Sequence, residues 1–255
     1  MNFQIKLAEQ IIEINSLFEQ TYAYCARYRV DDQISAQPEI VVTITQEDIE
    51  KERLLLQQEN VEEGAADLNV LNVSNTKYLE RSIVYKKIAA SMLTYDTLLM
   101  HGVLISTEGQ GYIITAPSGV GKSTRALLWL QSIPESMIVN GDKPLIRITD
   151  DTVYAYGTPW SGKEKWDINI SVPLRAIFLL ERARYRGEFF IEEVSIGSAL
   201  SFLLRQTFRE EDDPAFTRKV IQLLYRLKDN VKFFRLCCEP SVESVKRAYE
   251  TVRIK

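Results

Sequence analysis

The chain has 255 residues, 45% of them hydrophobic, so it can bury a substantial core as one large domain or as a larger and a smaller one. Its formal net charge of −4 removes the broad electrostatic attraction that a nucleic acid or an anionic membrane requires of a partner. No run of about 18 apolar residues predicts a membrane span, and Glu9 and Glu13 interrupt the stretch that a secretory signal would keep apolar. We therefore expect a globular, cytoplasmic protein with no nucleic-acid or membrane partner.

The amino-terminal part of the chain carries patterns of both secondary structures. Residues 3–8 and 39–45 alternate apolar and polar side chains as strands do, whereas residues 17–30 have helical spacing. The charged stretch at residues 48–64 is compatible with a helix or with a mobile arm. We predict a small α+β region over residues 1–75.

From residue 76 onward, strands and helices are mixed throughout. The expected helices cover residues 77–94, 123–133, 198–208 and 217–229, with a last one after Pro240. The expected strands cover residues 102–107, 111–116, 136–139, 144–149, 152–158, 175–182 and 231–236. This mixture favours an α/β domain over residues 76–255.

The segment APSGVGKST, residues 116–124, fits the phosphate-loop pattern G-x-x-x-x-G-K-[ST] except that Ala116 stands at the first glycine position. Wrapping N–H groups around phosphate oxygens requires backbone angles that only glycine adopts easily, and the segment has two glycines. Lys122 would lie between the β and γ phosphates, and Ser123 would offer its hydroxyl to Mg²⁺. The predicted nucleotide-binding residues are Ala116, Pro117, Ser118, Gly119, Val120, Gly121, Lys122, Ser123 and Thr124.

A carboxylate that follows a neighbouring strand often holds the metal in phosphate-loop proteins. Asp142 takes that place after the expected strand at residues 136–139. It can share Mg²⁺ with Ser123, or accept a proton from an attacking hydroxyl. In a chain without the loop, the same residue would be interpreted as an ordinary turn aspartate.

The stretch from His101 to Arg147 resembles the catalytic core of HPr kinase/phosphorylases, and more closely the shorter HPr-kinase-like proteins, a group related to phosphoenolpyruvate carboxykinases. In that family a His-Gly pair precedes the loop, and an aspartate after the next strand accepts the proton of the substrate serine. His101, Lys122 and Asp142 fall on the family's catalytic positions, and Ser123 and Asp142 on those that hold the metal. The resemblance implies a P-loop kinase core of the HPr kinase and phosphoenolpyruvate carboxykinase type.

Two further segments, NGDKPLIR and YGTPWSGK, resemble a pair that lines the site in the HPr-kinase-like subgroup. In the second segment, Trp160, Gly162 and Lys163 are predicted to contact the substrate, since a lysine suits a phosphate or an acidic group. The alternative is that Trp160 and Trp166 close one edge of the core. A lone histidine such as His101, taken without the family, is more often a structural residue.

The chain departs from the family pattern at two places. The family usually has two adjacent aspartates where this chain has Gly141 and Asp142, so one carboxylate that shares in metal or proton handling is absent. A glutamate that helps to hold the metal would fall near Pro159, which leaves Glu164 or Asp167 as substitutes.

These observations predict an ATP-dependent kinase that uses Mg²⁺, with GTP or pyrophosphate as alternative phosphate donors. Its acceptor would be a hydroxyl, most naturally that of serine, on a small protein, a peptide or a small molecule. HPr kinases are oligomers, so the resemblance also implies a homo-oligomer. The alternative from another class is a nucleotide-binding module without turnover, which Gly141 favours. A carboxykinase acting on a small organic acid is a weaker alternative, because His101 is the single histidine.

Overall fold

The computed structural model describes residues 1–31, 37–63, 75–210 and 212–253. The chain divides into two compact units, Met1–Ser91 and Met92–Lys255. The division falls at the end of helix α4 (Thr76–Met92), whereas the boundary expected from the sequence lies before that helix. Within the described part of the chain, no helix combines the length and the apolar character that a membrane crossing requires.

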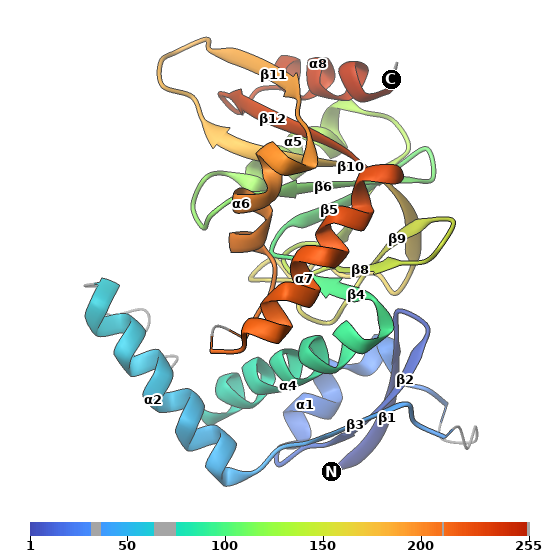
Figure 1. The fold of residues 1–255 in the computed structure, drawn as a ribbon, viewed down its shortest axis with the longest axis vertical. Coiled ribbons are helices and arrows are strands. Elements are labelled where there is room, and N and C mark those ends of the chain that lie inside the picture. Colours follow the sequence, from blue (N-terminus) through green and yellow to red (C-terminus); the bar gives the residue numbers. More distant parts are fainter. Residues whose placement is uncertain (32–36, 64–74, 211, 254–255) are drawn as a thin grey trace. The chain divides into compact units, whose positions relative to one another are not determined.

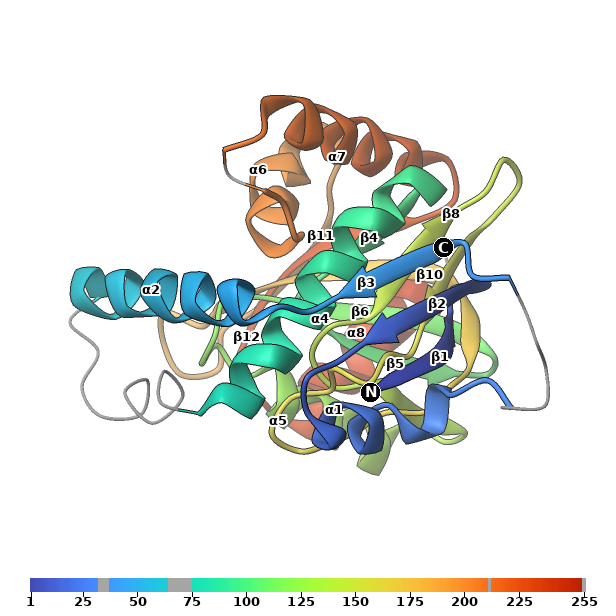
Figure 2. The same ribbon diagram turned by 90° about the horizontal axis from the view of Figure 1, so that it is seen from below.

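The first unit has, over its described residues, a three-stranded sheet in the order β1-β2-β3 (Figure 2). Strand β2 pairs antiparallel with β1 and parallel with β3. The strands are β1 (Asn2–Leu7), β2 (Gln10–Asn15) and β3 (Ile40–Thr43). The other elements are α1 (Glu19–Tyr24), a 3₁₀ turn (Ala26–Tyr28), α2 (Gln46–Glu63) and α4.

Helix α4 is joined to the start of the first unit by Glu80. This buried carboxylate accepts hydrogen bonds from the backbone N–H of Leu17, at 2.5 Å, and from the hydroxyl of Thr21. The charged stretch that the sequence left open is helical from Gln46 to Glu63, and residue 64 lies outside the described residues. The strands expected at residues 3–8 and 39–45 are confirmed as β1 and β3. Strand β2 was not predicted.

The second unit contains, among its described residues, a nine-stranded mixed sheet (Figure 1). The order is β4-β8-β9-β10-β6-β5-β7, with β12 also paired to β10 and β11 to β12. Strands β6, β10 and β12 run parallel, so their carboxyl ends meet at one edge. The strands are β4 (Thr97–Leu99), β5 (Val103–Thr107), β6 (Gln110–Thr115), β7 (Ser136–Asn140), β8 (Leu145–Ile148), β9 (Val153–Tyr156), β10 (Ser171–Arg182), β11 (Phe189–Glu193) and β12 (Lys232–Cys238).

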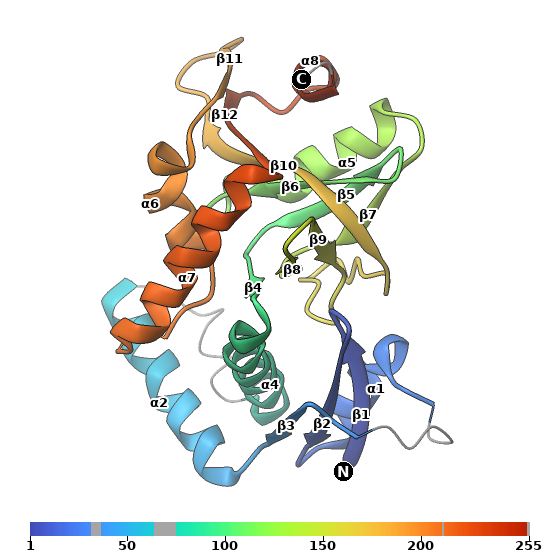
Figure 3. The same ribbon diagram turned by 45° about the vertical axis from the view of Figure 1, so that its right-hand side comes forward.

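Helices cover both faces of this sheet (Figure 3). The residues of β5 explain why, because Val103 and Ile105 belong to one buried cluster and Leu104 to the other. A strand buried on both faces is expected to be mostly apolar, and β5 is apolar from Val103 to Ile105. Helices α5 (Lys122–Ser132) and α8 (Val242–Arg253) supply residues to the first cluster, and α6 (Ile196–Gln206) and α7 (Pro214–Arg226) to the second. Two 3₁₀ turns complete the unit, Leu93–Tyr95 and Leu227–Asp229.

The fold of this unit is therefore α/β, as the sequence predicts. The helices expected after residue 76 are confirmed, and so is the antiparallel hairpin of β5 and β6. Strands β4 and β11 were not predicted.

Candidate functional site

The glycine loop (residues 116–121) joins β6 to α5. Ala116 is buried directly after the last residue of β6, and Gly119 and Gly121 have φ angles of 75° and 105°. Residues with a Cβ rarely adopt these angles, so both positions require glycine, as expected. Helix α5 begins at Lys122, and the positive end of its dipole lies at the loop.

The other residues predicted to bind nucleotide lie at the surface of the loop and of the first helical turn. Pro117, Ser118 and Thr124 are exposed, whereas Val120 and Ser123 are half-buried. The loop is consequently open to solvent on one side, where an anion can reach it.

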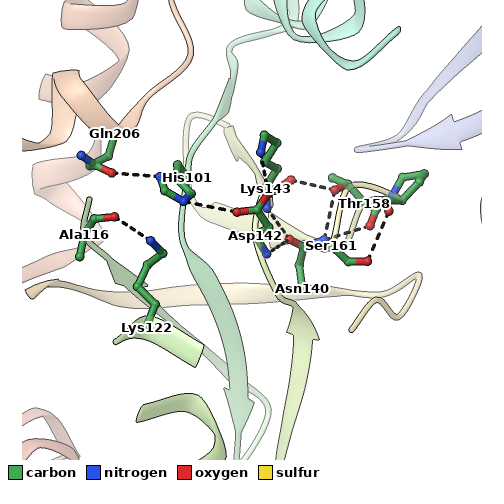
Figure 4. Close-up of polar contacts among 10 residues, drawn as sticks. His101, Ala116, Lys122, Asn140, Asp142, Lys143, Thr158, Ser161 and Gln206 are labelled. Atoms are coloured by element: carbon green, nitrogen blue, oxygen red, sulfur yellow. Dashed lines mark hydrogen bonds and ion pairs between the residues drawn. The ribbon is translucent and has the colours of Figure 1, made fainter. Parts of the chain in front are cut away.

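Lys122 is 8% exposed, and its ammonium group turns back to the loop. Its Nζ donates to the carbonyl oxygens of Ala116, at 2.8 Å, and Pro117, at 3.3 Å (Figure 4). Burial lowers the pKa of Lys122; the negative charge of Asp142 opposes that shift, and the charge of Lys143 adds to it. The amine thus donates its hydrogen bonds to the loop carbonyls, while Asp142 acts on it through its charge.

Asp142 is positioned by a buried asparagine at the end of β7. The side-chain oxygen of Asn140 accepts hydrogen bonds from the backbone N–H groups of Asp142, at 3.0 Å, and Lys143, at 2.7 Å. Its amide nitrogen donates to the carbonyl oxygen of Thr158 at 2.9 Å. Asn140 is fully buried, so this network holds the turn that presents the Asp142 carboxylate.

His101 lies between Asp142 and Gln206 (Figure 4). Its Nε2 is 3.3 Å from Oδ1 of Asp142, and its Nδ1 is 3.2 Å from the side-chain oxygen of Gln206. Backbone bonds support the same arrangement, since His101 N–H donates to the Gln206 carbonyl at 2.7 Å and Gly102 N–H to the Asp142 carbonyl at 2.8 Å. The imidazole is thus held through both ring nitrogens.

The second oxygen of the Asp142 carboxylate contacts Lys143, whose Nζ lies 2.5 Å from Oδ2. Burial alone would raise the pKa of Asp142, but the hydrogen bond from His101 and the positive charge of Lys143 outweigh it and lower the pKa to about 2. Asp142 is therefore an ionised carboxylate at neutral pH. Of the three residues predicted to act together, His101 and Asp142 are in contact, and the charge of Asp142 acts on Lys122.

The predicted substrate-contacting residues lie on the loop that follows β9, and they have different environments. Trp160 is only 5% exposed, which favours the interpretation that it closes an edge of the core. Gly162 has a φ of 79°, and a Cβ there would lie 3.2 Å from Cβ of Asp142. Lys163 is exposed. The loop thus lies beside the Asp142 side chain at Gly162, while the Trp160 side chain is buried.

Gly141 is enclosed by the same loop. A Cβ at this position would lie 2.5 Å from the carbonyl oxygen of Ser161, a distance that real side chains do not tolerate. The Gly141 N–H donates to the carbonyl of Trp166 at 2.9 Å, which keeps the loop against it. The second carboxylate of the family pattern therefore has no room here. Of the two proposed substitutes, Asp167 accepts a hydrogen bond from Ser161 at 3.1 Å and Glu164 is exposed.

Few protein side chains at this site are available to bind a metal ion. Among the described residues, no group of three or more His, Cys, Asp or Glu side chains is arranged to hold a metal ion. Mg²⁺ is usually bound in such sites by one or two side chains together with phosphate oxygens and water. Ser123 and Asp142 each carry an oxygen of the kind that Mg²⁺ binds, and phosphate would have to complete the coordination.

Comparison with known proteins gives one family. Residues 65–239, more than half of the chain, match the model of the family described as SynChlorMet cassette protein ScmC. The chain belongs to the ScmC family. No curated protein sequence matches this ScmC-family chain. A solved structure of the HPr(Ser) kinase/phosphatase from Coxiella burnetii aligns with it at 10% identity and a TM-score of 0.37, over 61% of this chain and 88% of that one.

Three residues of the site were given no individual role in the prediction from the sequence. Asn140 and Lys143 flank Asp142 in the segment NGDK, where a turn-capping asparagine and an adjacent cation are recognisable signals. Gln206, at the end of α6, has no such signal, because it meets His101 only through the fold.

Proposed function

We propose that this ScmC-family protein binds the phosphates of ATP at the glycine loop and transfers the γ-phosphoryl group to a hydroxyl. The observation that carries the proposal is a loop with two positive-φ glycines at a helix amino terminus, with Lys122 on the loop and His101 in contact with Asp142. The charge of Asp142 also acts on Lys122. Phosphoryl transfer mainly requires that the protein position the reactants and neutralise the charge of the phosphate. The acceptor we propose is a serine or another hydroxyl on a small protein, a peptide or a small molecule, and the assembly is a homo-oligomer.

In the proposed reaction, the acceptor oxygen attacks the γ-phosphorus as the bond between that phosphorus and the β,γ-bridging oxygen breaks. Asp142 would receive the proton of the hydroxyl, and its ionised state makes it available for that role. Lys122 and His101 would stabilise the charge on the phosphate oxygens. Ser123 and Asp142 would hold Mg²⁺, which supplies further neutralisation of the phosphate charge when it is bound.

A nucleotide-binding module without turnover is the second candidate, and two observations favour it. Gly141 leaves no space for a second carboxylate, and both oxygens of Asp142 already have side-chain partners, His101 and Lys143. Such a protein would signal to a partner by being loaded with nucleotide or empty.

One experiment separates the two candidates without knowledge of the acceptor. The purified protein is mixed with Mg²⁺ and γ-labelled ATP, with and without pyrophosphate, and both affinity and phosphate release are measured. Lys122→Ala should weaken ATP binding by about tenfold or more. Asp142→Asn should reduce phosphate release by a factor of about 100 or more and leave binding intact. Asp151→Asn, at an exposed turn, is the matched control.

The results assign the function directly. Slow phosphate release that depends on Asp142 supports the kinase. Equal ATP binding by the wild type and Asp142→Asn, with no release from either, supports the module without turnover. A wild-type protein that binds neither ATP nor pyrophosphate contradicts both.

A further inference from the structure

Arg125 is a buried cation directly behind the glycine loop, and the proposed chemistry does not use it. It lies one turn into α5, on the same inward face as Lys122, and is only 2% exposed. A buried guanidinium is strongly destabilising unless an anion or a full set of hydrogen bonds compensates for the lost hydration. Its partners therefore show whether such compensation exists.

The partners of Arg125 are neutral. Its Nη2 donates to the carbonyl oxygen of Cys238 and lies 3.5 Å from the sulfur of the same residue. Its Nε is buried and has no hydrogen-bond partner. No acidic side chain of the described residues forms an ion pair with it. The positive charge of Arg125 is thus uncompensated inside the protein.

The guanidinium lies against the loop. A Cβ at Gly121 would be 3.2 Å from Nη1 of Arg125, so this group occupies the space directly beside the last loop residue. A second arginine approaches from the end of β10, where Nη2 of Arg182 donates to the carbonyl of Gly119 at 2.7 Å. Both arginines reach the loop because β6, β10 and β12 end at the same edge of the sheet.

We infer that Arg125 is a phosphate-binding residue: its buried charge is compensated by a di- or triphosphate bound in the glycine loop. The inference rests on the proposed nucleotide site and adds a residue to it. Three cations, Lys122, Arg125 and Arg182, surround the loop and donate hydrogen bonds to backbone carbonyls. Such a charge excess suits a ligand with several negative charges, such as pyrophosphate or the end of a nucleoside triphosphate. Because Arg125 is shielded from water, its charge acts on that ligand with little screening, whereas exposed Arg182 is screened more.

The test compares affinity for pyrophosphate, measured by calorimetry, with the thermal stability of the anion-free protein. Arg125→Met removes the charge and should weaken pyrophosphate binding by about tenfold or more, while the Tm without anion stays the same or rises. Arg125→Lys keeps the charge and should retain most of the affinity. Arg182→Met should lose less affinity than Arg125→Met. Arg226→Met, which breaks an ion pair with Asp96 away from the loop, is the control and should leave affinity unchanged.

The outcomes below show whether Arg125 binds phosphate. A fall in Tm for Arg125→Met together with unchanged affinity shows a structural arginine and overturns the inference, while leaving the proposed function standing. Wild-type protein that binds neither pyrophosphate nor ATP overturns both. If Arg125→Met does not fold, Arg125→Gln, which keeps a donor for the Cys238 carbonyl, replaces it in the same comparison, with the same results expected.

Discussion

The Nε2 atom of His101 lies 3.3 Å from Oδ1 of Asp142, and the backbone N–H of Gly102 donates to the carbonyl of Asp142 at 2.8 Å. The imidazole and the carboxylate are therefore held together by both side chain and main chain. These contacts join the two residues that precede β5 to the turn after β7, and the two strands pair antiparallel. This relationship makes the carboxylate the centre of the site, and its electrostatics can be tested.

The ion pairs of Asp142 predict how its contribution to stability depends on pH. Its pKa in the folded protein is about 2, below the ordinary value of 3.8, so it stabilises the fold above about pH 4 and loses that effect as the pH falls toward 2. At pH 7 the contribution is about 2 kcal/mol, and at pH 3 about half of that. Urea unfolding of the wild type and Asp142→Asn at both pH values measures it. A stability difference of the same size at pH 7 and pH 3 would contradict the ion pairs.

Gln206 predicts a change in the environment of His101 that can be observed directly. In Gln206→Leu, Nδ1 of the imidazole loses its hydrogen-bond partner, so the ring is no longer held through both nitrogens. We expect phosphate release to fall by about tenfold, with ATP affinity unchanged. His101 is the single histidine, so the ¹⁵N spectrum of histidine-labelled protein at pH 7 reports on this ring alone, and its nitrogen signals should shift.

The matched control for that variant is Gln131→Leu, at an exposed position of α5. It should leave the histidine spectrum and the activity as in the wild type. A spectrum of Gln206→Leu that superimposes on the wild-type spectrum would show that Gln206 does not position the ring.

The enclosure of Gly141 predicts that a second carboxylate beside Asp142 cannot be introduced by substitution at this position. In Gly141→Asp the new Cβ would lie 2.5 Å from the carbonyl of Ser161, so the loop must move. We expect the free energy of unfolding to fall by about 1–3 kcal/mol, measured by urea titration, with no gain in phosphate release. Gly197→Ala is the control: a Cβ there meets only the Ser195 hydroxyl at 3.8 Å, and alanine should stabilise α6 by up to about 1 kcal/mol. An active, stable Gly141→Asp protein would show that the enclosure is not restrictive.

Replacing Asn140 by alanine is expected to lower both the stability and the activity of the protein. Asn140→Ala removes the side-chain acceptor of the Asp142 N–H and one of two acceptors of the Lys143 N–H, the other being the Trp160 carbonyl. This loss should lower the free energy of unfolding by about 1–3 kcal/mol. The turn that presents Asp142 would also lose its order, so phosphate release should fall even where the protein is folded. Asn2→Ala, in an exposed hydrogen bond with Glu13, is the comparison and should change neither quantity appreciably. Full activity in folded Asn140→Ala would show that the turn holds without this residue.

The sequence alone predicted the features that depend on neighbours along the chain. The glycine loop could be identified because Gly119 and Gly121 adopt angles that exclude other residues, and because an apolar strand and a helical repeat flank it. The position of Asp142 after a buried strand was predicted on the same basis. Local backbone preferences and hydrophobic periodicity determine these features, and both can be read over a few residues.

Only the tertiary structure decided which residues from distant parts of the chain meet around the glycine loop and Asp142. Gln206 reaches His101, and Arg125 reaches the Cys238 carbonyl, across more than a hundred residues of chain. Trp160 shows the same limit, since its burial depends on how the loop packs and not on its neighbours in the sequence. No local pattern encodes such contacts, because strand order and helix packing, which arise from burial of the whole core, determine which ends lie side by side.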